Sequence, residues 1–469
     1  MSARLCQATC LYTPEEANHG AREAHGKGRE DEDQHMADTV TTETPIDRGL
    51  EQFRKNGLVK GAQAPKASEI DLATFDITDP EYWRQEIFWD YFTRMRKEAP
   101  VLFTPESPYG PYWNVTTYKD IMTVDTTHGI FSSEGGITVV DQDEDFQLPM
   151  FIAMDPPKHD LQRKTVQSIV GPENLKSFES LIRSRTTALF DSLPIGEPFD
   201  WVDKVSIELT TMMLATLFDF PFEDRRKLTR WSDVATGRNN PDIVTSEEQW
   251  RGELLECLGY FTRLWNERVN VEPRGDLVSM LAHGEHTRNM TPQEYLGNLL
   301  LLIVGGNDTT RNSMTGGVYA MMHKWPDQWA KLKANPELLP SAVSEIIRWQ
   351  TPLAHMRRTA LEDFELNGQT IRKGDKVLMW YVSGNRDETQ FNKPELLNIE
   401  RPMVRRHLSF GFGIHRCVGN RLAELQLQIL WEEILARFDR IEVLAEPERI
   451  PSAFVKGYAA MPVKLHPKT

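Results

Sequence analysis

The sequence predicts a mainly α-helical protein with small β-sheets. Helical patterns dominate from about residue 155 to 350 and again from about 417 to 438. Strand-like runs are short, such as the one around Trp113 and the pair that flanks Asn367 and Gly368. The longest apolar run, residues 299–304, is apolar on all sides, which indicates a helix that passes through the interior.

Two regions of different composition divide the 469 residues. Residues 1–70 contain the stretch HGAREAHGKGREDEDQH, which is charged and almost free of large apolar side chains. Such a segment cannot bury enough surface to offset its ordering entropy, so we expect a disordered tail. Because no repeat or long linker interrupts the rest of the chain, we expect residues 71–469 to form one domain.

Charge and cysteine content restrict the class of protein. The net charge of -15 argues against nucleic-acid binding, because phosphates would repel the chain. The longest apolar run is too short to cross a bilayer, so we expect no integral membrane segment. The four cysteines do not form a disulfide framework pattern. We therefore expect a soluble, cytoplasmic protein.

Two strand regions carry clear local signals. The stretch PYWNVTTYKD predicts a strand at Trp113 and then the start of a helix. In DFELNGQTIRKGDKVLMWY, Asn367 and Gly368 form a strong tight-turn signal between two strand-like runs, which predicts a hairpin.

The apolar run belongs to a long predicted helix. Thr291 can cap it, Pro292 suits its first position, and Glu294 completes a capping box. The stretch GGNDTT then interrupts the pattern, although glycine costs about 1 kcal/mol inside a helix and a buried acid requires a partner. Either another helix crosses closely at this notch, or a flat group approaches the backbone and uses Asp308 and Thr309.

Two charged pairs have helical spacing. Glu345 and Arg348 lie three residues apart, as an ordinary surface ion pair would. His159 and Arg163 lie four apart in a helix that we expect to begin at Pro156, after Asp155. They form either an exposed cationic stripe or a clamp for a small dianion.

Cys417 lies in the glycine-rich, cationic stretch SFGFGIHRCVGN. Free buried cysteine usually acts as a small hydrophobe, but that explains neither the glycines nor the cations. Backbone N–H groups and the start of a helix favour an anionic sulfur. Zinc fits poorly, because no second ligand lies at zinc-site spacing. A lone thiolate is the ligand that haem iron takes in oxygen-activating enzymes.

These motifs together resemble the cytochrome P-450 superfamily. Phe410, Gly411, Gly413, His415, Cys417 and Gly419 match its haem-binding signature, GGNDT resembles its oxygen-activating helix segment, and EIIR its Glu-x-x-Arg pair. The resemblance covers nearly all of the chain after the tail. It implies the helical prism fold of that family around haem b (iron protoporphyrin IX).

The resemblance implies a role for each matching residue. Cys417 would bind the iron, and Asp308 with Thr309 would form a catalytic acid–alcohol pair. Glu345 and Arg348 would be structural, with Arg401 as a third partner, because Leu stands where the family has its usual Arg. The positions expected to hold the haem and its propionates are His159, Arg163, Arg358, His415, Gly305, Gly306 and Phe410, with Arg357 the less favoured neighbour.

The stretches FIAMDPPKHD and HRCVGNRLAELQL are most similar to bacterial terminal hydroxylases of alkanes and fatty acids. This branch implies a small apolar linear substrate, O2, and electrons from a ferredoxin and ferredoxin reductase. Alternatives are a hydroxylase of cyclic terpenoids or steroids, or a non-catalytic haem-based gas sensor. The pocket positions expected from the family are Ile137, Val139, Val140, Leu302, Ile303, Leu353, Met356 and Phe454.

Overall fold

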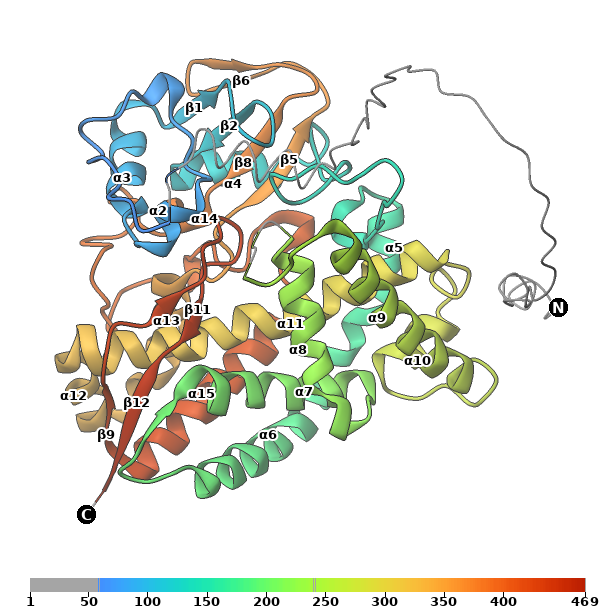
Figure 1. Ribbon diagram of the computed structural model, residues 1–469, viewed down its shortest axis with the longest axis vertical. Helices are drawn as coiled ribbons and strands as arrows, with labels where there is room; N and C mark the ends of the chain where they lie inside the picture. The colour runs from blue at the N-terminus through green and yellow to red at the C-terminus, as the bar shows by residue number, and fades with distance from the viewer. Residues whose placement is uncertain (1–57, 59, 239, 241, 469) are drawn as a thin grey trace, which may run out of the picture. The chain divides into compact units, whose positions relative to one another are not determined.

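A five-stranded sheet lies at one end of the molecule, shown at the top of Figure 1. The computed structural model describes residues 58, 60–238, 240 and 242–468, so most of the expected tail lies outside the described residues. Strands β2 and β8 pair in parallel, and the other pairs are antiparallel. In sheet order the strands are β1 (Val101–Thr104), β2 (Tyr112–Val115), β8 (Lys376–Met379), β5 (Met356–Ala360) and β3 (Phe131–Ser132).

Both sequence signals for strands are confirmed. Strand β2 precedes α4 (Tyr118–Thr126), which Thr117 caps by accepting a hydrogen bond from the Asp120 amide. Strands β6 (Phe364–Leu366) and β7 (Gln369–Ile371) form the hairpin around Asn367 and Gly368, which both have positive φ. The remaining strands are β4 (Pro198–Asp200), β9 (Phe438–Val443), β10 (Glu448–Arg449), β11 (Tyr458–Ala460) and β12 (Pro462–Pro467).

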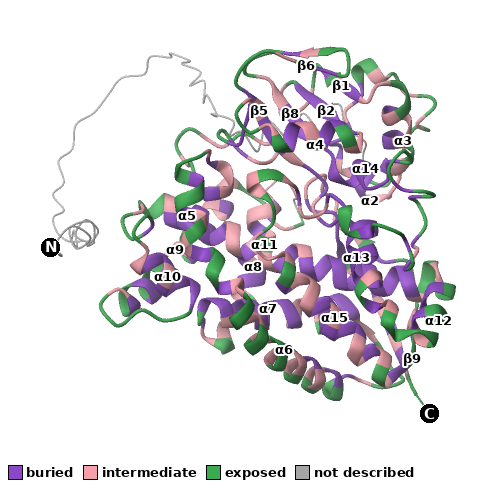
Figure 2. Cartoon of the chain, turned by 180° about the vertical axis from the view of Figure 1, so that it is seen from behind, coloured by how far each residue is buried: buried purple, intermediate pink, exposed green. Residues whose placement is uncertain are grey.

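Helices make up the rest of the structure, so the predicted mainly helical class is confirmed. The long helix α11 (Pro292–Val318) contacts several other helices and is buried along most of its length (Figures 1 and 2). Its α-helical neighbours include α7 (Glu208–Phe218), α8 (Arg226–Thr236), α9 (Glu247–Arg268), α13 (Leu339–Gln350) and α15 (Asn420–Arg437). The other long helices are α3 (Phe88–Glu98), α5 (Lys158–Gln167), α6 (Pro172–Ser192), α10 (Leu277–His283) and α12 (Pro326–Ala334).

Two helix starts differ from the sequence predictions. The hydroxyl of Thr291 caps α11 as expected, but Glu294 accepts a hydrogen bond from Gln162 Nε2 at 2.6 Å instead of closing a capping box. Helix α5 begins at Lys158 and not at Pro156. Among the described residues, none of the helices has the length and apolar character that crossing a membrane requires.

The last part of the expected tail is described and contacts the domain. The backbone carbonyls of Ala67 and Ile70 accept hydrogen bonds from Arg94 Nη1 at 2.6 and 2.8 Å. The carbonyl of Ala62 accepts one from Gln85 Nε2 at 2.7 Å. Residues 60–70 therefore lie along α3 and the short α2 (Pro80–Arg84) instead of extending away from them.

The pair Glu345 and Arg348 is fully buried and is not a surface ion pair. Arg348 Nε and Nη2 each lie 2.8 Å from a Glu345 oxygen. Arg401, the expected third partner, places its Nε 3.0 and 3.1 Å from the same two oxygens. Its other nitrogens donate to backbone carbonyls of residues 392–396. One carboxylate thus fixes α13 against the segment that leads into the Cys417 loop.

Replacing Arg401 should therefore destabilise the fold strongly. Arg401→Met leaves a buried carboxylate and three carbonyls short of donors, so we expect the free energy of unfolding to fall by about 3–5 kcal/mol. Denaturant unfolding followed by tryptophan fluorescence measures this loss. Lys331→Met, which breaks an exposed pair with Glu400, is the control. Equal losses in both variants would contradict the role given to Arg401.

Candidate active site

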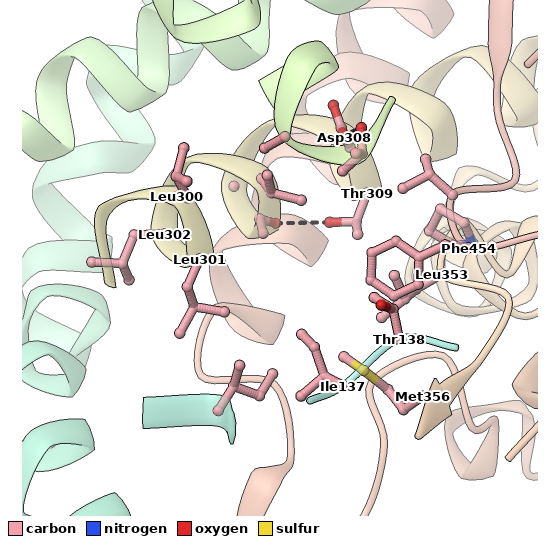
Figure 3. Close-up of a pocket in the computed structure, with 18 of the residues that line it drawn as sticks. Ile137, Thr138, Leu300, Leu301, Leu302, Asp308, Thr309, Leu353, Met356 and Phe454 are labelled. Carbon is pink, nitrogen blue, oxygen red and sulfur yellow. Dashed lines mark hydrogen bonds between the residues drawn. The ribbon is translucent and has the colours of Figure 1, made fainter. Parts of the chain in front are cut away.

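A cavity of about 490 Å³ lies between α11 and the loop that carries Cys417. The side chain of Cys417 is exposed to this cavity. Figure 3 shows part of the wall, where residues of α11 such as Leu301 and Thr309 face Ile137, Leu353 and other apolar side chains. Residues far apart in the sequence therefore meet around one enclosed space.

The Cys417 loop has a tightly specified backbone. Gly411 and Gly413 have φ values of 64° and 66°, which side chains disfavour. A Cβ on Gly413 would also lie 2.5 Å from the backbone oxygen of Asp125. The Cys417 amide donates to the Phe410 carbonyl at 2.8 Å, which closes the loop. The glycines are thus required for the loop to reach its position beside α4.

The loop places the Cys417 sulfur where a bound cation would favour its deprotonated form. Burial raises the pKa of the Cys417 thiol, whereas the amides of Gly419 and Asn420 and the guanidinium of Arg163 act in the opposite direction. The amides belong to the start of α15, as the sequence predicted. A bound metal ion would add the positive charge needed to make this sulfur a thiolate.

The buried carboxylate of Asp125, at the end of α4, ties the loop to its surroundings. Its Oδ2 accepts hydrogen bonds from the Phe412 amide at 2.8 Å and from the Tyr381 hydroxyl at 2.9 Å. Its Oδ1 accepts one from Arg358 Nη2 at 2.9 Å. Burial raises the pKa of Asp125, and the charge of Arg358 opposes that rise. No sequence signal pointed to this residue, because its partners come from separate segments.

Two histidine rings meet at the Cys417 loop, and one of them, His415, lines the cavity. His159, on α5, has its ring centroid 4.3 Å from that of His415. His159 Nδ1 pairs with Asp160 at 2.7 Å. His159 Nε2 and His415 Nδ1 are buried, and neither has a hydrogen-bond partner within the described ranges. Burial lowers the pKa of both rings, that of His415 to about 2.

Two arginines complete this end of the cavity. Arg163 and Arg358 line it, whereas Arg357 lies away from it and binds Asp141 at 2.6 Å. Arg163 Nη2 donates to the Arg416 carbonyl at 2.5 Å. Two guanidinium groups and the imidazole of His415 thus line the cavity together with a single thiol, whereas His159 is buried behind His415 and does not line it. This donor set fits a metal-bearing ring whose edge carries carboxylates, as haem b does.

Thr309 and Asp308 lie on the α11 side of the cavity. The Thr309 hydroxyl donates to the Gly305 carbonyl at 2.9 Å, the dashed line of Figure 3. The fully buried Asp308 forms an ion pair with Arg311, whose Nη2 lies 2.8 Å from its Oδ1, and the same nitrogen donates to Asp233 of α8 at 3.0 Å. Burial raises the pKa of Asp308 to about 6, and Arg311 opposes the rise. Burial thus favours the protonated acid, whereas the ion pair with Arg311 favours the carboxylate.

The two glycines before them have different surroundings. A Cβ on Gly305 would meet no atom within 4 Å, so this residue opens α11 to the cavity. A Cβ on Gly306 would lie 2.7 Å from Leu214 of α7. The sequence left a helix-crossing notch and an approach to the backbone as alternatives, and each glycine fits one of them.

Most of the expected apolar residues line the cavity, but Ile303 does not. Ile303 is fully buried in the core on the opposite side of α11, so its expected place in the pocket is wrong. Helical phase explains this, because Leu301, Gly305 and Thr309 recur every four residues and Ile303 points away from that face. Leu301 and Thr138 were not predicted. The expected residues that line the cavity are Ile137, Val139, Val140, Leu302, Leu353, Met356 and Phe454.

Comparisons with known proteins agree with this geometry. The model of the family described as Cytochrome P450 matches residues 269–457. The chain is 36% identical to linalool 8-monooxygenase of Pseudomonas putida, over 84% of this chain and 99% of that protein. It is 30% identical to a methyl-branched lipid omega-hydroxylase of Mycobacterium tuberculosis, over 86% and 97%. A solved structure of cytochrome P450-153 from Novosphingobium aromaticivorans is 49% identical, with a TM-score of 0.78, over 84% and 99%.

Replacing Cys417 tests the site directly. Cys417→Ser removes the sulfur, so the purified variant should lose the Soret absorption maximum of a thiolate-bound haem. Absorption spectra of the ferric protein and of its ferrous carbonyl adduct measure the effect. Cys257→Ala, which changes a buried cysteine of the core, should leave both spectra unaltered. An unchanged Soret maximum in Cys417→Ser would refute the assignment.

Proposed function

The chain belongs to the cytochrome P450 family, and from this premise we propose that it hydroxylates the terminal carbon of medium-chain alkanes or fatty acids. Membership makes it a monooxygenase with haem b, O2 as oxidant and electrons from a redox partner. Bound haem supplies the activation of O2 at a thiolate-ligated iron. Cys417 would hold the iron, and His159, Arg163, Arg358 and His415 are the residues that would hold the propionates.

Thr309 and Asp308 would move protons on the α11 side of the cavity, opposite the Cys417 loop. The Thr309 hydroxyl faces the cavity, and the neighbouring Asp308 is part of a buried chain of polar groups through Arg311 to Asp233. A carboxyl with a pKa of about 6 both accepts and releases protons near neutral pH. The Thr309 hydroxyl therefore orients a proton at the reacting centre, and Asp308 supplies the proton that replaces it after transfer.

The apolar wall carries the substrate proposal. Thr309 is surrounded by the apolar side chains Leu301, Ile137, Leu353 and Phe454 (Figure 3). Gly305 has no side chain, so α11 is open to the cavity at that point. A slim linear substrate that enters a cavity with such a wall end-on presents its terminal carbon to the oxidant, because the length of the substrate prevents a sideways approach. The omega-hydroxylase relative and the sequence resemblance to terminal hydroxylases support the same regiochemistry.

A cyclic or branched terpenoid is the second candidate substrate. The relative named linalool 8-monooxygenase is the observation that favours it, at 36% identity. The haem-based gas sensor considered from the sequence loses its support, since family membership gives a monooxygenase.

Electrons would reach the haem from a ferredoxin and its reductase. On the Cys417 side of the haem site, Arg405, Arg406, Arg416 and Arg421 are all exposed. In a chain of net charge -15, this local group of cations favours an acidic partner. Docking there would bring the donor close to the sulfur.

A panel of substrates separates the two candidates. The enzyme reconstituted with a ferredoxin and its reductase is incubated with n-octane, lauric acid and a monoterpene, and mass spectrometry locates the new hydroxyl. We expect the new hydroxyl at the terminal carbon of n-octane, and at the same position of lauric acid if the enzyme accepts it. Hydroxylation of the monoterpene alone would contradict the proposal and favour the second candidate.

Thr309→Ala should uncouple reductant use from product formation. The variant keeps the haem, but without the hydroxyl the ratio of product to consumed reductant should fall at least about tenfold, with hydrogen peroxide released instead. Product, reductant and peroxide are measured in the same reaction. Thr309→Ser keeps a hydroxyl and should retain much of the coupling. Unaltered coupling in the alanine variant would exclude the role.

A further inference from the structure

The end of the cavity away from Cys417 has an unusual charge balance. Four arginines line the cavity in the described part of the chain, and two of them, Arg163 and Arg358, stand at the Cys417 end. The other two are Arg238, just after α8, and Arg311 of α11.

Each of these two arginines is already held by two carboxylates. Arg311 lies 2.8 Å from Asp308 and 3.0 Å from Asp233. Arg238 Nη2 hydrogen-bonds to Asp143, and it lies 2.9 Å from Glu247 of α9. Arg251 also binds Asp143 and Glu247, together with Asp145, so three cations face five acids and this end carries an excess of negative charge. A substrate carboxylate would enter against that excess.

The position of Arg238 is fixed by further contacts. Its guanidinium packs over the ring of Trp250 at 4.3 Å. Asp143 and Glu247 also bind Arg251, at 3.2 and 2.6 Å, and Arg251 binds Asp145 at 2.7 Å. The side chains of Asp143, Arg238 and Glu247 are only 7%, 12% and 11% exposed. Because they are little hydrated, these charges act strongly on a group beside them.

We propose that Asp143 and Glu247, by holding the guanidinium of Arg238, make the cavity select uncharged substrates and reject carboxylates. The inference rests on the proposed function and narrows it from alkanes or fatty acids to neutral chains. The two acids are specificity-determining residues, because they withdraw the cation that a fatty-acid carboxylate would otherwise bind.

Binding of matched neutral and anionic ligands tests this without turnover. At pH 7.5 the haem absorption change is titrated with 1-decanol and decanoate, and with a cyclic terpenoid alcohol and its acid. We expect the intact enzyme to bind the alcohol at least about tenfold more tightly than the acid of the same pair. Arg238→Gln should not lower this ratio, because the guanidinium is already engaged and its loss leaves Asp143 and Glu247 with less positive charge beside them.

Releasing the guanidinium should weaken the preference for the alcohol. Glu247→Gln should lower the alcohol-to-acid ratio at least about threefold, and adding Arg238→Gln should abolish that gain. Asp143→Asn provides a second variant with the same expected direction. Glu248→Gln makes the same charge change at an exposed neighbour in the first turn of α9, and it should leave the ratio unaltered.

The outcomes separate the two proposals. If the intact enzyme binds decanoate as tightly as decanol and Arg238→Gln weakens decanoate alone, the charge inference is overturned. If only the cyclic pair binds, the linear-substrate proposal fails, and the ratio within the cyclic pair still decides the inference. If none of the four compounds binds, both are overturned.

Discussion

The placement of one sulfur atom constrains the rest of this structure. Cys417 must face the cavity from a loop that reverses sharply, and this loop adopts its path only with glycine at positions 411 and 413. The carboxylate of Asp125 then fixes the loop through the Phe412 amide and reaches Arg358 with its other oxygen. The Cys417 loop and Arg358 therefore both bind the buried carboxylate of Asp125, so neither can shift without the other.

Buried arginines serve two purposes in this chain. Arg348 and Arg401 surround one carboxylate far from the cavity, where they join α13 to the approach of the ligand loop. Arg238 and Arg311 lie at the cavity wall and are each shared between two acids. In both places the guanidinium offers several donors in fixed directions, which lets one side chain hold several acceptors. The two groups differ in their charge balance, because acid is in excess only at the cavity wall.

Local sequence signals predicted the parts of the structure that depend on neighbouring residues. The cap at Thr291, the turn at Asn367 and the glycine loop before Cys417 were all predictable, because backbone geometry demands those residue types. The resemblance added the roles of the site residues. Ile303 was placed in the pocket wrongly, because an all-apolar run does not show which face of a helix lines a cavity. Counting back from Thr309 in steps of four residues gives Gly305 and Leu301, and this count would have shown that Ile303 lies on another face.

Contacts between distant segments could not be predicted from local patterns. Asp125 gathers partners from β5, from α14 (Tyr381–Gly384) and from the ligand loop, and nothing in its neighbouring sequence indicates this. The same holds for Arg238, whose two acids lie 95 and 9 residues away along the chain. Such residues become visible only when the fold brings their partners together.

The segment of residues 60–70 has a consequence for how this family can diverge. Gln85, Tyr91 and Arg94 bind it through the main-chain oxygens of Ala62, Pro65, Ala67 and Ile70. Main-chain acceptors exist whatever side chain a residue carries. These hydrogen bonds therefore survive changes of side chain in the segment, and the side-chain requirement falls on Ala64, Ala67 and Ile70, which pack against the core.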